Sequence, residues 1–204
     1  MTEPAKRRAT YAELEAVPDH LVAEIIDGEL VTHPRPSPRH SMTSNSLADE
    51  LTGPFQKGRG GPGGWVFANE PELHLGPQVL VPDLAGWRRK RLPAYPETNY
   101  FTVVPDWVCE VLSASTERRD RGVKTRIYAE AGIAYLWIVD PRQQRLEAFT
   151  LRDDHWFLSG TWTSDDKVTA PPFDAISFSL ADLWPLDRPL GLNEDAQAHY
   201  VGDR

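Results

Sequence analysis

The fold is decided by WVCEVLSASTERRDRGVKTRIYAEAGIAYLWIV, residues 107–139. Residues 107–112 form a compact apolar run of strand type, and residues 134–140 form a continuous apolar run, typical of a strand covered on both faces. Between them, the polar segment 113–117 supplies the cap of a connecting helix, which Gly132 closes. A strand, a helix and a second strand in this order form a right-handed crossover between parallel strands, and this unit predicts an α/β fold.

Further elements are predicted around this unit. Two apolar runs, 21–26 and 29–31, flank Asp27-Gly28, which is the strongest short-range signal for a β-hairpin. Apolar residues at near-helical spacing predict an amphipathic helix over residues 41–55, ended near Gly53-Pro54. Additional strands are expected at residues 65–67, 72–75, 79–87, 145–150 and 155–160.

These elements predict the organisation of the chain. We expect a central mixed sheet flanked by helices, with additional β-hairpins at the N-terminal and C-terminal ends. A single domain is predicted over residues 10–187, after a disordered basic lead-in at 1–9 and before a loose tail at 188–204. Loops are expected at residues 33–39, 58–64 and 88–105.

The composition limits the classes of function. The chain has 204 residues, of which 40% are hydrophobic and 25% charged, so we expect a globular protein with one well-buried core. Its apolar runs fall short of the roughly 20 residues of a membrane span, and its first residues lead into no apolar signal core, which predicts a cytoplasmic protein without a membrane partner. The single Cys109 excludes an internal disulfide, and neither paired cysteines nor closely spaced histidines indicate zinc.

The charge is distributed unevenly along the chain. A formal net charge of −8 argues against a protein that coats nucleic acid through bulk electrostatics. Residues 86–126, however, contain nine basic and five acidic residues, a local net charge of +4. A phosphate-binding surface and ordinary solvated helix and loop faces both explain this excess.

Two acidic residues lie in or beside predicted buried strands, where a charge is costly. Asp83 directly follows a proline in an apolar run, and Glu110 lies inside the strand of residues 107–112. Buried acids need a cation, a hydrogen-bond network or a metal as partner. Together with Lys124, these two acids would supply a divalent-cation site with an adjacent ammonium. These are the groups used for the hydrolysis of phosphodiester bonds. An ordinary pair between Lys124 and Asp120, four residues apart on one helix face, is the alternative.

Several short motifs follow one another along the chain. They are Ile26-Asp27-Gly28-Glu29-Leu30, Ser37-Pro38-Arg39-His40, Val81-Pro82-Asp83, Cys109-Glu110-Val111-Leu112-Ser113, Asp120 with Lys124, Tyr128-Ala129 and Trp137-Ile138-Val139-Asp140-Pro141. In this order and spacing the chain resembles the Uma2 family of endonucleases, which have the restriction-endonuclease-like, PD-(D/E)XK fold. The resemblance covers residues 11–184.

The resemblance implies a metal-dependent endonuclease. Asp83 and Glu110, together with the backbone carbonyl of Val111, would bind Mg²⁺ or Mn²⁺, which prefer oxygen ligands. Lys124 would be the catalytic ammonium. In the common form of the motif a lysine stands two residues after the second acid, where this chain has Leu112, so the pattern is broken and Lys124 on the following helix takes that place.

Three further residues are expected to support the site. Asp120 would position Lys124, and Glu24 and His40, which also match the family's pattern, would line the cleft as further metal or water ligands. A contact of His40 with backbone at a helix N-terminus is the alternative. The implied substrate is nucleic acid, with DNA favoured over RNA.

Two other classes of function compete with the nuclease. The first is a catalytically weak or inactive nuclease fold that binds nucleic acid or acts as an oligomeric scaffold, which Leu112 and the acidic net charge favour. The second is a structural protein in which Asp83 and Glu110 satisfy backbone or arginine partners. Core packing explains most of the seven tryptophans, and exposed ones would serve a homodimer contact. Carboxylates of Asp83 and Glu110 on opposite sides of the sheet would leave only the structural alternative.

Overall fold

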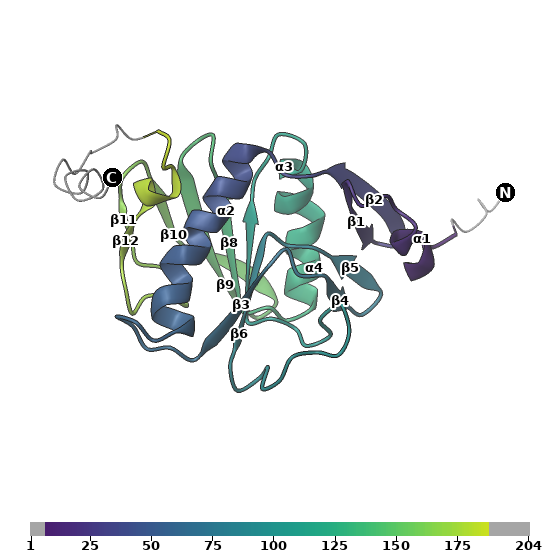
Figure 1. Ribbon diagram of the computed structural model, residues 1–204, viewed down its shortest axis with the longest axis horizontal. Helices are drawn as coiled ribbons and strands as arrows, with labels where there is room; N and C mark the ends of the chain where they lie inside the picture. The colour runs from purple at the N-terminus through teal and green to yellow at the C-terminus, as the bar shows by residue number, and fades with distance from the viewer. Residues whose placement is uncertain (1–6, 188–204) are drawn as a thin grey trace, which may run out of the picture.

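A computed structural model describes residues 7–187 of the chain (Figure 1). Most of the predicted lead-in and the predicted tail, residues 1–6 and 188–204, lie outside the described residues. Within residues 7–187, none of the helices combines the length and the apolar character needed to cross a membrane.

A six-stranded mixed sheet forms the centre of the molecule. Its strands lie in the order β10-β9-β8-β7-β6-β3, in which β7 and β8 are parallel and every other neighbouring pair is antiparallel. The parallel pair confirms the predicted strand, helix and strand unit. The bounds are β3 Trp65–Asn69, β6 Leu84–Arg88, β7 Trp107–Val111, β8 Tyr135–Asp140, β9 Arg145–Arg152 and β10 His155–Thr163.

The helix that joins β7 to β8 contains a wider turn. It consists of α3 Glu117–Arg119, the π-helical segment η2 Asp120–Lys124 and α4 Thr125–Glu130. The hydroxyl of Thr125 donates to the carbonyl oxygen of Gly122 at 2.7 Å, so a side chain satisfies a carbonyl in this wider turn. The sequence predicted one regular helix here, and π turns of this kind occur often at functional sites.

The long helix α2 crosses the central sheet and begins earlier than predicted. It covers Pro38–Leu51 and continues as the π-helical segment η1 Thr52–Gln56. The predicted start at residue 41 is wrong because Ser37 caps the helix and proline is well tolerated at the first helical position, where its missing N–H is not needed. The regular α-helix ends at Leu51, close to the predicted Gly53-Pro54, but the sequence did not predict the wider turn of η1, which carries the chain past this proline.

A smaller antiparallel sheet lies beside the centre. Its order is β2-β1-β5-β4, and its bounds are β1 Leu21–Ile26, β2 Glu29–Pro34, β4 Leu73–Leu75 and β5 Gln78–Leu80. The predicted hairpin at Asp27-Gly28 is confirmed, with positive φ angles of 52° and 82° at these two residues. The single strand predicted over 79–87 is wrong, because β5 and β6 belong to different sheets. The segment between them contains Pro82, which cannot donate to a strand ladder.

The two faces of the central sheet are covered by different elements. Odd-numbered residues of β7, such as Cys109, pack with α2 and with the C-terminal segment, whereas even-numbered residues, such as Val108, pack with α4. That C-terminal segment contains β11 Lys167–Val168, β12 Phe178–Ser179 and the 3₁₀ helix η3 Leu180–Leu183, and the short helix α1 Tyr11–Glu15 precedes the hairpin. Because side chains alternate along a strand, Glu110 must lie on the α4 face.

Candidate active site

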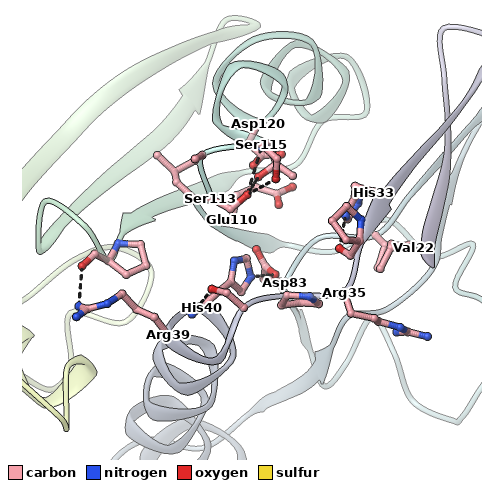
Figure 2. Close-up of a pocket in the computed structure, with 18 of the residues that line it drawn as sticks. Val22, His33, Arg35, Arg39, His40, Asp83, Glu110, Ser113, Ser115 and Asp120 are labelled. Atoms are coloured by element: carbon pink, nitrogen blue, oxygen red, sulfur yellow. Dashed lines mark hydrogen bonds and ion pairs between the residues drawn. The ribbon is translucent and has the colours of Figure 1, made fainter. Parts of the chain in front are cut away.

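A pocket opens where the two sheets, the start of α2 and the helix after β7 meet (Figure 2). Its volume is about 470 Å³. The residues predicted for the site that line it are Asp83, Glu110, Lys124, His40 and Asp120. Figure 2 shows Asp83 and Glu110 facing this one pocket, so their carboxylates do not lie on opposite sides of the sheet.

Asp83 is held by hydrogen bonds at both carboxylate oxygens. The segment between β5 and β6 carries it to the pocket, where Oδ2 accepts the backbone N–H of Val111 at 2.7 Å. Oδ1 lies 2.5 Å from Nε2 of His40, which comes from the first turn of α2. The earlier start of α2 therefore places His40 inside the helix, and its side chain contacts Asp83.

Glu110 is buried against the helix that follows its own strand. Its Oε1 accepts a hydrogen bond from the phenol of Tyr128 and lies 2.8 Å from Nζ of Lys124. Burial raises the pKa of Glu110 well above its ordinary value. The ammonium of Lys124 opposes this shift, while the negative charges of Asp120 and Asp83 add to it.

Lys124 lies between two carboxylates from different sheets. Its Nζ is 2.8 Å from Glu110 and 3.0 Å from Oε1 of Glu24, and its side chain is only 3% exposed. Burial alone would lower the pKa of Lys124, but the carboxylates of Glu110 and Glu24 raise it well above its usual range, so the ammonium stays protonated. Asp120 is a more distant partner, with Oδ1 at 3.9 Å from Nζ.

Glu24 belongs to the small sheet and is fully buried. Burial would raise its pKa, yet Lys124, His33 and the backbone N–H of Val81 together lower the pKa to about 2. The N–H of Val81 donates to Oε1 at 2.9 Å, and Nε2 of His33 lies 3.6 Å from Oε2. Glu24 is absent from the pocket lining and reaches the site through Lys124.

The pKa values of Asp120 and His40, two further titratable residues of the pocket, are also shifted. Burial raises the pKa of Asp120, although Lys124 opposes this. Burial lowers the pKa of His40, but its hydrogen bond to Asp83 and the charge of that carboxylate outweigh burial, and the net effect is a raised pKa.

The carboxylate groups at the pocket fit a hard divalent cation, because they are negatively charged and offer oxygen ligands. The acidic side chains gathered around Lys124 and the pocket are Glu24, Glu70, Asp83, Glu110 and Asp120. Lys124 is shared among Glu24, Glu110 and Asp120, and the charges of Asp120 and Asp83 add to burial in raising the pKa of Glu110. Within residues 7–187, no three acidic, histidine or cysteine side chains form a complete metal cage. Mg²⁺ suits such a site because it uses one or two carboxylates and keeps several waters.

Two residues of this network were not assigned a role from the sequence, although signals for them existed. Tyr128 follows Asp120 and Lys124 at the same spacing of four residues, so all three share one side of the helix. His33 lies on the face of the hairpin that carries Glu24, since Glu24 pairs with Val31 and side chains alternate along the strand.

Cationic and hydroxyl side chains also line the pocket. Arg39 and Arg142 line it, each with an acidic partner, and Arg35 binds the backbone carbonyl of Asp19. The hydroxyl of Ser113 lies 3.0 Å from that of Ser115 at the end of β7. The pocket therefore combines acidic side chains with cationic and hydroxyl side chains that can donate to anionic groups.

Comparisons with known proteins agree with this fold. The model of the Uma2 family, described as "Putative restriction endonuclease", matches residues 8–181. A solved structure described as "a putative nuclease belonging to DUF820 from Anabaena variabilis ATCC 29413" is similar over 85% of this chain and 95% of that chain. The sequence identity is 20% and the TM-score 0.68, a likeness of fold that confirms the predicted restriction-endonuclease-like mixed sheet. Among curated proteins, no match was found.

Proposed function

The chain belongs to the Uma2 family, and from that membership we propose that it is a metal-dependent endonuclease that hydrolyses phosphodiester bonds in DNA in preference to RNA. The observation that carries the proposal is the convergence of Asp83, Glu110 and Lys124 on one pocket. They come from the link between the sheets, a central strand and the π turn of a helix, and these separate elements meet only in the folded chain.

The proposed cofactor is Mg²⁺ or Mn²⁺, held by Asp83, Glu110 and the backbone carbonyl of Val111. When bound, such an ion lowers the pKa of a coordinated water and polarises a phosphate oxygen. Asp83 suits this role because His40 and the N–H of Val111 hold its carboxylate in one orientation. Each carboxylate oxygen has a second lone pair, so these hydrogen bonds leave ligand positions free.

Lys124 is proposed to stabilise the negative charge that develops on the phosphate and to orient the attacking water. Its protonated state supports the first task, because a preorganised ammonium in a buried site stabilises developing charge strongly. Glu24 and Asp120 hold the lysine from two sides and are positioning residues. Tyr128 does the same for Glu110.

A nucleic-acid-binding protein without turnover is the second candidate. Leu112, at the position where the common motif has a lysine, is 1% exposed in the core and contributes nothing to the pocket chemistry beyond its wall. In this candidate the pairing of Lys124 with Glu24 and Glu110 serves stability alone. Binding measured in EDTA and cleavage measured with metal separate the two candidates.

The deciding experiment is a cleavage assay on supercoiled plasmid, linear duplex, single-stranded DNA and RNA with Mg²⁺, Mn²⁺ or EDTA. We expect metal-dependent cleavage by the parent chain and its loss in Asp83→Asn and Lys124→Ala. Thermal melting of each variant checks the fold. Absence of cleavage by a folded parent on every substrate, or cleavage by both variants at the rate of the parent, would contradict the nuclease proposal.

A further inference from the structure

The end of the β3–β6 pair that lies away from the pocket carries a concentration of basic side chains. Two stretches meet there: residues 56–64, from the last residue of η1 to the start of β3, and residues 88–96, from the last residue of β6 into the loop that follows it. Neither stretch contains an acidic residue, although the chain as a whole has a net charge of −8. The basic residues, which we call the basic ridge, are Lys57, Arg59, Arg88, Arg89 and Lys90, and all five are exposed.

Backbone and side-chain contacts join the two loops into one surface. The N–H of Arg89 donates to the carbonyl of Gly64 at 2.9 Å, and Gln56, Arg89 and Tyr95 line one hollow of about 250 Å³. The guanidinium of Arg88 lies 4.1 Å from the ring centre of Trp65, which orders its side chain without neutralising it.

Neighbouring contacts leave the charge of the ridge largely uncompensated. Arg89 donates to the carbonyl oxygens of Leu92 and Pro93, which carry no net charge. Arg91 is the basic residue of this segment that has an acidic partner, Asp106 at 2.8 Å, and we leave it out of the ridge for that reason. The ring of Tyr95 is 94% exposed beside these cations.

The register of the strands places the ridge at a fixed distance from the candidate active site. Trp65 pairs with Arg88 at one end of the β3–β6 pair, and Asn69 pairs with Leu84, next to Asp83, at the other. Five residues of strand span about 16 Å, which equals about five base pairs of duplex along its axis. In Figure 1 this end of the pair lies toward the bottom of the view, whereas α3 lies at the top.

We propose that the basic ridge is a second binding surface, which holds the phosphate backbone of the nucleic acid about five base pairs from the bond that the pocket cleaves. Exposed lysine and arginine with an exposed aromatic ring is the composition of backbone-binding surfaces in nucleic-acid-binding proteins. The inference rests on the proposed function. It explains how a chain of net charge −8 retains a substrate that is itself an anion.

The test uses charge reversal at two ridge residues and a matched control. R59E/K90E and R152E/K167E each replace one exposed arginine and one exposed lysine, so both change the net charge equally. Binding of a fluorescent 20-base-pair duplex is measured by anisotropy in EDTA over a series of salt concentrations. We expect R59E/K90E to bind at least about fivefold more weakly, with a salt slope smaller by about 2, because two phosphate contacts are lost.

The control separates a local surface from bulk charge. R152E/K167E should bind within about twofold of the parent chain. Three results would contradict the proposed role of the basic ridge. They are equally weakened binding by both variants, binding of R59E/K90E with the affinity of the parent, and tighter binding of the parent to phosphatidylserine vesicles than to duplex. Because binding is measured without metal, a failure of cleavage contradicts the nuclease proposal and leaves the ridge result standing.

Discussion

Glu24 in the small sheet and Glu110 in the central sheet both bind Lys124, yet their carboxyl groups behave in opposite ways. Both are buried, and Nζ lies 3.0 Å from one and 2.8 Å from the other. The pKa of Glu24 is lowered to about 2, because Lys124, His33 and a backbone N–H outweigh burial. The pKa of Glu110 is raised well above its ordinary value, because burial acts together with the charges of Asp120 and Asp83.

The difference teaches that burial is the largest influence on the pKa of both carboxyl groups, and that their neighbours decide in which direction each pKa finally shifts. Glu24 pairs with Lys124 and accepts the backbone N–H of Val81, two contacts within the protein that suit a structural anchor. Glu110 shares Lys124 with Glu24, but it is fully buried and also faces the negative charges of Asp120 and Asp83. This is the property expected of a ligand for a metal ion.

The largest effect expected from this comparison concerns cleavage. Glu110→Gln should lower the cleavage rate at least about a thousandfold, which corresponds to about 4 kcal/mol in the activation free energy. Its fold should persist, since the amide oxygen can still accept the hydrogen bond of Tyr128. Plasmid cleavage and thermal melting measure the two effects, with Glu130→Gln on the exposed side of α4 as the control. A folded Glu110→Gln that cleaves as well as the parent would remove Glu110 from the site.

The second largest effect is the contribution of the Glu24 carboxylate to the stability of the fold. Glu24→Gln should lower the free energy of unfolding by roughly 3 kcal/mol, because it breaks a buried ion pair and leaves Lys124 less compensated. Urea unfolding at pH 7 measures this loss. If Glu110→Gln destabilises the chain more than Glu24→Gln does, the division into anchor and metal ligand is incorrect.

Metal binding should distinguish the two carboxylates as well. Mg²⁺ at about 100 times its dissociation constant should raise the unfolding free energy of the parent by about 2.7 kcal/mol. Differential scanning fluorimetry should show this stabilisation in the parent and in Glu24→Gln but not in Glu110→Gln. The same stabilisation in all three proteins would place the ion elsewhere.

The smallest effect is a pH dependence carried by Glu24. A carboxyl with a lowered pKa in the folded state contributes stability above its unfolded pKa of 4.5, and this contribution is lost as the pH falls toward 2. The stability difference between the parent and Glu24→Gln should therefore shrink by about 0.7 kcal/mol between pH 5 and pH 4. Urea midpoints of both proteins at the two pH values measure this change. If the stability difference between the parent and Glu24→Gln grows as the pH falls, the pKa of Glu24 is not lowered in the folded state.

The sequence predicted the parts of the fold that depend on local patterns. The hairpin at Asp27-Gly28 and the unit of residues 107–139 are confirmed because turn chemistry and apolar runs specify them locally. The strand over 79–87 is wrong because an apolar run does not reveal that its two halves join different sheets. The turns η1 and η2 were missed because helical periodicity does not register one wider turn.

The sequence predicted which residues belong to the candidate site better than it predicted the contacts between them. Asp83 and Glu110 stand out as acids in apolar runs, and the contact between Glu24 and Lys124 joins residues 100 positions apart, which no local pattern encodes. The raised pKa of Glu110 is caused first by burial and then by the charges of Asp120 and Asp83, and all of these depend on tertiary packing. The assignment of catalytic and metal-binding roles to these residues stays a prediction.

The π turn of η2 makes the length of this helix segment part of the site. A π turn closes its hydrogen bond over one residue more than an α turn does. Removing a residue inside Arg121–Val123 would convert the π turn into an α turn, whereas removing a single residue from 125–127, after the π turn, would rotate everything that follows by about 100° around the helix axis relative to Lys124. Tyr128 would then leave Glu110, although every side chain of the site would still be present in the sequence. Loss of one codon here would disable the site as thoroughly as replacing one of its acids.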